Sequence, residues 1–133
     1  MRVLLVDDEV DFAATVSSRL ALRGIGTDVV HDGQQALDYV EAQEPDVMVL
    51  DLNMPGLTGM DVLRRVGKNN PNIQVLILTG HGMKKEKEEA QRLKAFDYLS
   101  KPTDVDTLAE RIRSGYAYKA EKMKAAAKTT RQM

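Results

Sequence analysis

Residues 47–56 read VMVLDLNMPG, four apolar residues followed at once by an acid and then by an Asn-Met-Pro-Gly segment. An unbroken apolar run of this length, rich in Val and Leu, is typical of a strand buried on both faces of a parallel sheet. Asn, Pro and Gly all favour turns, but a turn does not require the carboxylate of Asp51. The segment therefore predicts a buried strand that places one acidic side chain at the edge of a sheet.

Short apolar runs of the same kind recur along the chain. Besides 47–50, they lie at residues 3–6, 29–30, 75–78 and 98–99. Between them, apolar residues return at three- and four-residue intervals, the spacing of amphipathic helices. Strand and helix alternating five times predict a single α/β domain of the (βα)5 type, an open parallel sheet with helices on both faces. Right-handed crossovers then give a doubly wound, flavodoxin-like sheet with strand order 2-1-3-4-5.

Glycine and proline mark the expected helix ends. Gly24 stands where the first helix should stop, and Gly67 and Pro71 are expected to close the third. Residues 84–94 are strongly charged and contain few apolar positions. We interpret them as a helix with a solvated face that carries pairs of opposite charge.

Composition narrows the function classes. The chain has 133 residues, a length that suits one domain, and its net charge of −1 offers no argument for binding nucleic acid or an anionic membrane. The absence of cysteine excludes disulfides, zinc–thiolate sites and thiol nucleophiles, and it fits a cytoplasmic location. No apolar run is long enough for a membrane span or a signal peptide, so we expect no membrane association.

Charge is distributed unevenly along the chain. Residues 1–114 hold 14 Lys and Arg against 19 Asp and Glu, whereas residues 115–133 hold five against one. We therefore divide the chain into an acidic domain, residues 1–115, and a basic Ala/Lys-rich tail, residues 116–133.

The tail has two interpretations. Four residues at spacings of four, three and four would form a narrow apolar stripe on a helix: Tyr116, Ala120, Met123 and Ala127. If the last helix of the domain continues through the tail, that stripe offers a surface for a homodimer or the start of a linker. Gly115 favours the other interpretation, a frayed basic end.

Hydrophilic groups follow four of the five apolar runs. Asp7 and Asp8 follow the first run, Asp51 the third, Thr79 the fourth and Lys101 the fifth. Ligands of open α/β sheets bind beyond the carboxyl ends of the strands. Because strand 1 lies between strands 2 and 3 in the predicted order, Asp7, Asp8 and Asp51 should converge. Taken alone, the acids at 7–9 are better interpreted as an N-cap and first-turn acids of the next helix, but Asp51 and Lys101 reverse that preference.

Three carboxylates this close repel one another unless a cation lies among them. Ligands that are all oxygen favour Mg²⁺, with Mn²⁺ as an alternative, over zinc. The Asp51 carboxylate beside such an ion, with Lys101 and Thr79 opposite, can attack phosphorus. The product would be an aspartyl phosphate.

Four segments carry a resemblance to a known family: residues 5–9 (LVDDE), 49–56 (VLDLNMPG), 78–82 (LTGHG) and 96–102 (FDYLSKP). In this order, and at the predicted strand ends, they resemble the signature blocks of CheY-like response regulator receiver domains of two-component signalling systems. The resemblance covers about residues 1–115. It implies that Asp51 is the phosphoacceptor, modified to 4-aspartylphosphate. It implies further that Mg²⁺ is held by Asp7 and Asp8, of which Asp8 is the more direct ligand, by Asp51, and by the backbone carbonyl of Asn53.

The resemblance also implies the moving parts of a switch. Thr79 matches the hydroxyl that turns toward the phosphoryl group, and Tyr98 the aromatic that changes rotamer with it. Lys101 matches the lysine that pairs with a phosphoryl oxygen, and Pro102 a proline that follows a cis bond. His81 matches a position that influences loss of the phosphoryl group to water, although a surface histidine without a catalytic role is the better interpretation.

The implied function is phosphorelay signal transduction. A sensor histidine kinase or a histidine phosphotransfer protein would phosphorylate Asp51, and the face formed by the fourth helix, the fifth strand and the fifth helix would bind a downstream protein. Such a domain assists its own phosphorylation and dephosphorylation but is not a multiple-turnover enzyme. We expect no direct binding of nucleic acid.

Two other functions are compatible with parts of this site, and one residue, Lys94, departs from the family pattern. A haloacid-dehalogenase phosphatase also uses Asp, Thr, Lys and an acid pair around Mg²⁺, but here the acid pair comes first and no cap domain fits. A degenerate receiver that serves only for docking conflicts with the intact set of site residues. Lys94 stands where many receivers have Gly, so a positive φ there would cost stability.

Overall fold

Five short strands form one parallel sheet in the computed structural model, which describes residues 1–80 and 84–132. The strand order is β2-β1-β3-β4-β5, and every neighbouring pair is parallel, as predicted. The strands are β1 Val3–Val6, β2 Thr27–Val30, β3 Val47–Leu50, β4 Gln74–Thr79 and β5 Asp97–Ser100.

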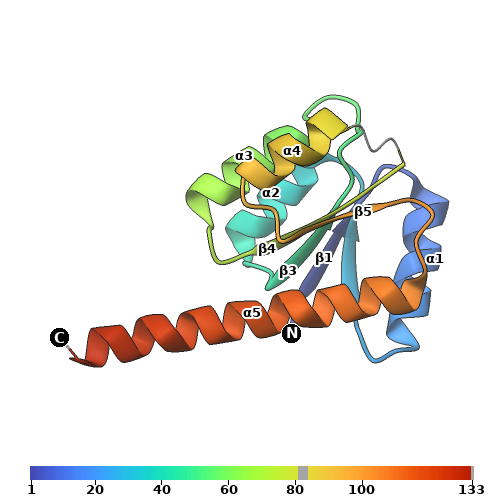
Figure 1. The fold of residues 1–133 in the computed structure, drawn as a ribbon. Helices are drawn as coiled ribbons and strands as arrows, with labels where there is room; N and C mark the ends of the chain where they lie inside the picture. The colour runs from blue at the N-terminus through green and yellow to red at the C-terminus, as the bar shows by residue number, and fades with distance from the viewer. Residues whose placement is uncertain (81–83, 133) are drawn as a thin grey trace.

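Helices cover both faces of the sheet. They are α1 Val10–Ala21, α2 Gly33–Ala42, α3 Gly59–Asn69, α4 Lys84–Arg92 and α5 Val105–Gln132. Figure 1 shows α2, α3 and α4 together on one side of the sheet and α1 and α5 on the other. Successive strand residues point to opposite faces, so Leu4 of β1 packs in the core beneath α2 and α3, whereas Leu5 packs in the core beneath α1 and α5. Burial on both faces explains why the strands read as unbroken apolar runs.

Two glycines near helix ends behave differently. Helix α1 ends at Ala21, and Gly24 follows with a φ of 80°, the left-handed conformation expected of a helix-stopping glycine. The expectation that Gly67 closes α3 is wrong, because α3 continues to Asn69 and Asn70 is its C-cap. Glycine weakens a helix without ending it unless its backbone turns left-handed, and Gly67 is not among the residues with positive φ.

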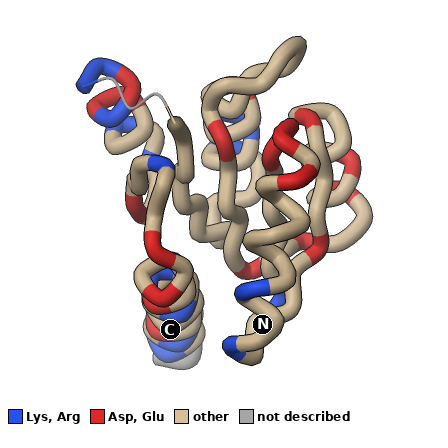
Figure 2. Tube along the Cα trace, turned by 90° about the vertical axis from the view of Figure 1, so that its right-hand side faces the viewer, with Lys and Arg blue, Asp and Glu red and all other residues tan. Residues whose placement is uncertain are grey.

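Helix α5 continues through Gly115 as far as Gln132. Gly115 is buried, and a Cβ at this position would lie 3.5 Å from the Cβ of Gln74, so the helix passes close to β4 here. Lys119 then binds Asp46, with its Nζ 2.7 Å from a carboxylate oxygen, and residues 120–128 are exposed. The helix extends beyond the body of the domain (Figure 1), and Figure 2, which looks nearly down its axis, shows Lys and Arg on it together with acidic residues. The tail is thus helical rather than frayed.

Lys94 has a φ of 67°, the only positive value for a non-glycine residue in the described part of the chain. It follows α4 and precedes β5, at the position where a glycine was expected. A side chain with a Cβ is strained in this conformation.

No helix among residues 1–80 and 84–132 is both long and apolar enough to cross a bilayer.

Candidate functional site

The carboxyl ends of the strands bring the predicted site residues to one edge of the sheet. The amide of Asp51 donates to the carbonyl of Val6 over 3.0 Å, and the amide of Lys101 donates to the carbonyl of Thr79 over 2.8 Å. Each bond extends a strand pair by one residue beyond its regular ladder. The backbone therefore fixes where these side chains begin, and the site is built on the sheet rather than on free loops.

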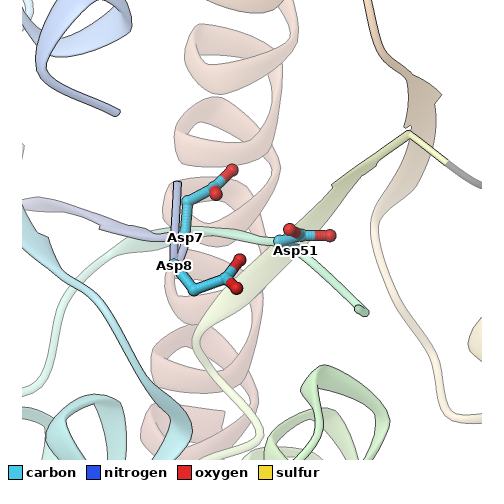
Figure 3. A group of neighbouring side chains, drawn as sticks. All are labelled: Asp7, Asp8 and Asp51. Carbon is cyan, nitrogen blue, oxygen red and sulfur yellow. The ribbon is translucent and has the colours of Figure 1, made fainter. Parts of the chain in front are cut away.

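Three carboxylates converge there, as predicted. Asp7, Asp8 and Asp51 each offer an oxygen, and these oxygens lie within 4.8 Å of one another. Figure 3 shows the side chains gathered around a common space. Asp7 and Asp51 are 1% and 3% exposed, so both are almost completely removed from solvent. Clustered carboxylate oxygens suit a hard divalent cation such as Mg²⁺, and the residues present fit that ion.

Burial raises the pKa of the Asp7 carboxyl above its ordinary value. Hydrogen bonds from the Lys101 ammonium and from the amide of Glu9 oppose that effect only in part. Burial therefore makes the charged form of Asp7 costly. A bound cation would remove much of that cost by neutralising the charge.

Lys101 faces the acid cluster from β5. Its Nζ lies 2.8 Å from an Asp7 oxygen, 3.1 Å from a Glu9 oxygen and 3.5 Å from an Asp51 oxygen. It also lies 4.3 Å from the centroid of the Phe12 ring, a cation–π contact. Burial acts to lower the pKa of Lys101, but the hydrogen bond to Asp7 and the negative charges of Asp51 and Asp7 outweigh burial, so its pKa is raised. The ammonium is therefore charged at neutral pH and stands beside the predicted phosphoacceptor.

Asn53 connects Asp51, the predicted acceptor, to Thr79, the predicted switch residue. Its amide N–H donates to a carboxylate oxygen of Asp51 over 3.1 Å, and its side-chain Nδ2 donates to Oγ1 of Thr79 over 2.9 Å. Thr79 is completely buried, so this bond satisfies a hydroxyl that has no access to water. The sequence singled out the carbonyl of Asn53 and did not reveal the side-chain bond to Thr79. The role of that carbonyl as a metal ligand stays a prediction.

Tyr98 packs its ring against the core beneath α2, α3 and α4. Its hydroxyl is buried and has no hydrogen-bond partner among the described residues, and neither has Oε2 of Glu86 on α4. Burial, and after it the negative charge of Glu86, raises the pKa of Tyr98. A buried hydroxyl without a partner costs free energy, so the described residues give this position of the ring no polar support.

Two further expectations concern the loops that follow β4 and β5. The Lys101–Pro102 peptide bond is cis, as the resemblance implied. His81 lies outside the described residues.

Gly59 is a site-supporting residue that the sequence analysis missed. It opens α3 directly after the loop that follows Asp51, and a Cβ there would lie 2.1 Å from the carbonyl oxygen of Asp51. Thr58 and Asp61 form a capping box that fixes this helix start. Only glycine allows such a close approach. In the sequence, Gly59 could have been noticed because it comes just before the apolar stripe of the third predicted helix.

This fold and this arrangement of acids and lysine define a signalling receiver, and the chain belongs to the response regulator receiver domain family, whose model matches residues 3–113. It is 33% identical over 114 residues to the response regulator MprA of Mycobacterium avium, covering 86% of this chain and 50% of that protein. It is 35% identical over 120 residues to the luminescence regulatory protein LuxO of Vibrio campbellii, covering 90% of this chain and 26% of that protein. The chain thus spans half the length of the first relative and about a quarter of the second.

Solved structures agree with the family assignment. The receiver domain of the Francisella response regulator 1452 matches with a TM-score of 0.82 and 33% identity, over 88% of this chain and 97% of that one. The chain is therefore a receiver domain of two-component signalling and not a haloacid-dehalogenase phosphatase.

Proposed function

We propose that this receiver accepts a phosphoryl group on Asp51, in a Mg²⁺-dependent reaction, from the phosphohistidine of a sensor histidine kinase or a histidine phosphotransfer protein. The observation that carries the proposal is the convergence of Asp51 with Asp7, Asp8 and the Lys101 ammonium at one sheet edge. An acceptor carboxylate, further acids for a metal and a fixed positive charge are the parts that phosphoryl transfer to an aspartate requires.

The bonding change is simple. A carboxylate oxygen of Asp51 forms a bond to phosphorus, the P–N bond of the phosphohistidine breaks, and its electron pair stays on the imidazole nitrogen. With Asp51 buried and tied by the Asn53 amide, the attacking carboxylate is held in place before the donor arrives. Lys101, 3.5 Å from Asp51, is placed to pair with an oxygen of the transferred group.

Asp7, Asp8 and Asp51, with the Asn53 carbonyl, would hold the Mg²⁺. When bound, the ion supplies positive charge that offsets the negative charge of the phosphoryl oxygens. The buried charge of Asp7, which burial makes costly and a cation would offset, supports this role.

Phosphorylation would then act as a switch. New anionic oxygens on Asp51 would attract the hydroxyl proton of Thr79, whose oxygen now accepts from Nδ2 of Asn53. Turning toward the phosphoryl group would move that oxygen away from Asn53. Tyr98, whose hydroxyl has no hydrogen-bond partner among residues 1–80 and 84–132, would move into the space that Thr79 leaves. Both changes bias the face formed by α4, β5 and α5 toward a form that binds a downstream protein.

The proposal concerns the receiver residues alone. We expect these residues to make no direct contact with nucleic acid and to work in the cytoplasm, a setting that the absence of cysteine fits. MprA and LuxO are longer than this chain, so what their remaining parts do is separate from this expectation.

Intact-mass spectrometry tests the central step. Wild type, Asp51→Asn and the control Asp38→Asn, an exposed acid on α2, are incubated with acetyl phosphate or phosphoramidate, with Mg²⁺ or with a chelator. We expect one phosphoryl adduct in wild type and Asp38→Asn, dependent on Mg²⁺, and none in Asp51→Asn. An adduct in Asp51→Asn at the wild-type rate would show that another residue is the acceptor. No adduct in wild type would leave a receiver that serves only for docking.

A further inference from the structure

Glu9 is a fourth carboxylate at this site, and neither the metal cluster nor the predicted switch uses it. Its Oε1 lies 3.1 Å from Nζ of Lys101, although 61% of its side chain is exposed. It is the N-cap residue of α1, yet its side chain makes no capping hydrogen bond within the described part of the chain. Ser, Thr, Asp and Asn are the usual N-cap residues because their short side chains accept from the first backbone amides of the helix. The longer Glu9 side chain reaches Lys101 instead.

The backbone directs this reach. The amide of Glu9 donates to Oδ1 of Asp7 over 2.9 Å, while the other oxygen of Asp7 lies 2.8 Å from the Lys101 ammonium. This hydrogen bond holds residues 7–9 in a tight turn, so the side chains of Asp7 and Glu9 both reach Lys101. An ammonium has three hydrogens, and Asp7, Glu9 and Asp51 together can occupy all three.

Phosphorylation changes what Lys101 must bind. A phosphoryl group on Asp51 brings several anionic oxygens to the side where Lys101 now has its longest contact, 3.5 Å. To bind them fully, the ammonium must give up another partner. Asp7 is almost completely buried and belongs to the acid cluster, whereas Glu9 is largely exposed and can return to water at little cost.

We propose that Glu9 is a positioning residue for Lys101, which holds the ammonium back from Asp51 and so weakens the binding of an anionic phosphoryl group. The inference rests on the proposed function of Asp51. The negative charge of Glu9 at the edge of the site would also repel small dianionic phosphodonors, so Glu9 would make the site selective between donors. A partner protein that presents phosphohistidine can offset that charge with its own contacts.

The test compares Glu9→Gln with Asp11→Asn. Gln keeps the size of Glu but removes its charge. Asp11 lies two residues further on in the first turn of α1, is exposed, and is not among the described partners of Lys101, so its variant removes the same charge without the contact. Affinity for beryllofluoride, a phosphoryl mimic, is measured at saturating Mg²⁺ by NMR titration of backbone amides. We expect Glu9→Gln to bind about two- to fivefold more tightly than wild type, the effect of a partly exposed ion pair.

Two further readouts separate the contact from a general effect of charge. The rate of phosphorylation should rise more with acetyl phosphate than with phosphoramidate, whose ammonium group reduces its net charge. The gain in beryllofluoride affinity should disappear when Lys101 is replaced by Met. The melting temperature should be the same in Glu9→Gln and wild type, which shows that the fold is intact.

A last readout needs no phosphoryl group. Mass spectrometry after brief treatment with an amine-acylating reagent should show faster modification of Lys101 in Glu9→Gln than in wild type or Asp11→Asn. A Glu9→Gln protein that matches Asp11→Asn in acylation and in beryllofluoride affinity overturns the proposal. If Lys101 is freed but wild type takes no phosphoryl group on Asp51, the proposed function fails while the restraint on Lys101 stands.

Discussion

Several residues at this site each bind more than one neighbour. Asn53 binds the acceptor carboxylate through its amide and the Thr79 hydroxyl through its side chain. Lys101 is shared among several carboxylates, of which Asp7 is the nearest. Because of this sharing, the phosphoryl group that we propose on Asp51 would change existing contacts as well as form new ones, as a two-state switch requires.

Lys94 offers a test of backbone strain that is independent of the site chemistry. Because its φ of 67° is unfavourable for a residue with a Cβ, Lys94→Gly should stabilise the protein by about 1 kcal/mol. Lys94→Ala removes the same charge and most of the side chain but keeps the strain, so it should give little or no gain. Urea unfolding of the three proteins measures the difference, and equal gains in both variants would locate the effect in the side chain.

At the residue scale, the sequence predicted the acid cluster well. Asp7, Asp8 and Asp51 could be found because each follows an apolar run, and parallel strands end at the same edge of a sheet. The contact of Glu9 with Lys101 could not be predicted, since it joins residues 92 positions apart and depends on which way a long side chain turns. Gly67 misled because glycine permits a left-handed backbone without requiring one.

Among the elements, the loop between β3 and α3 depends most on a single residue. A Cβ on Gly59 would meet the carbonyl oxygen of Asp51 at 2.1 Å and the Cα of Leu52 at 2.6 Å, and both are backbone atoms that cannot turn aside. The start of α3 therefore packs directly on the backbone that carries the acceptor.

Gly59→Ala should destabilise the protein by about 3 kcal/mol, because either α3 or the Asp51 backbone has to shift. Gly26→Ala is the matched control, since a Cβ there meets nothing within 4 Å and its φ is not positive. We expect the control to unfold at the wild-type urea concentration or slightly above it. If both variants unfold together, the close approach at Gly59 does not matter for stability.

Helix α5 shows why the sequence left two interpretations of the tail open. Gly115 favoured a frayed end, but its missing side chain allows the helix to pass close to Gln74 and Phe96. Tyr118 then stacks near the Phe96 ring, with 5.6 Å between centroids. Packing on a neighbouring strand overrides a local helix-weakening residue, and no local pattern in the sequence reports that contact.

For the molecule as a whole, Asp46 joins the first strand to the last helix. It accepts from the amide of Arg2 over 2.7 Å and binds Nζ of Lys119 over 2.7 Å. Burial acts to raise the pKa of Asp46, but the bonds from Lys119 and Arg2 outweigh it, and the pKa is lowered from its ordinary value of 3.8. A depressed folded pKa means that Asp46 contributes stability above pH 3.8, and that this contribution is lost as pH falls through the folded pKa.

Asp46→Asn should therefore lower the free energy of unfolding by about 0.5–1 kcal/mol at neutral pH. The difference from wild type should shrink as the pH is lowered below the ordinary Asp range. Urea titrations at a series of pH values measure it, with Asp11→Asn as the exposed control. A difference that stays constant down to the lowest pH would mean that the charge of Asp46 is not what matters.

The length of α5 has a mechanical consequence. From Lys119, which forms an ion pair with Asp46, to Gln132 the helix rises by about 20 Å, at about 1.5 Å per residue. A tilt of about 10° at Lys119 would move the far end of this segment by about 3.5 Å, at about 1.5 Å of rise per residue. Small rearrangements under α5 are thus enlarged by geometry alone, before any further contact is made.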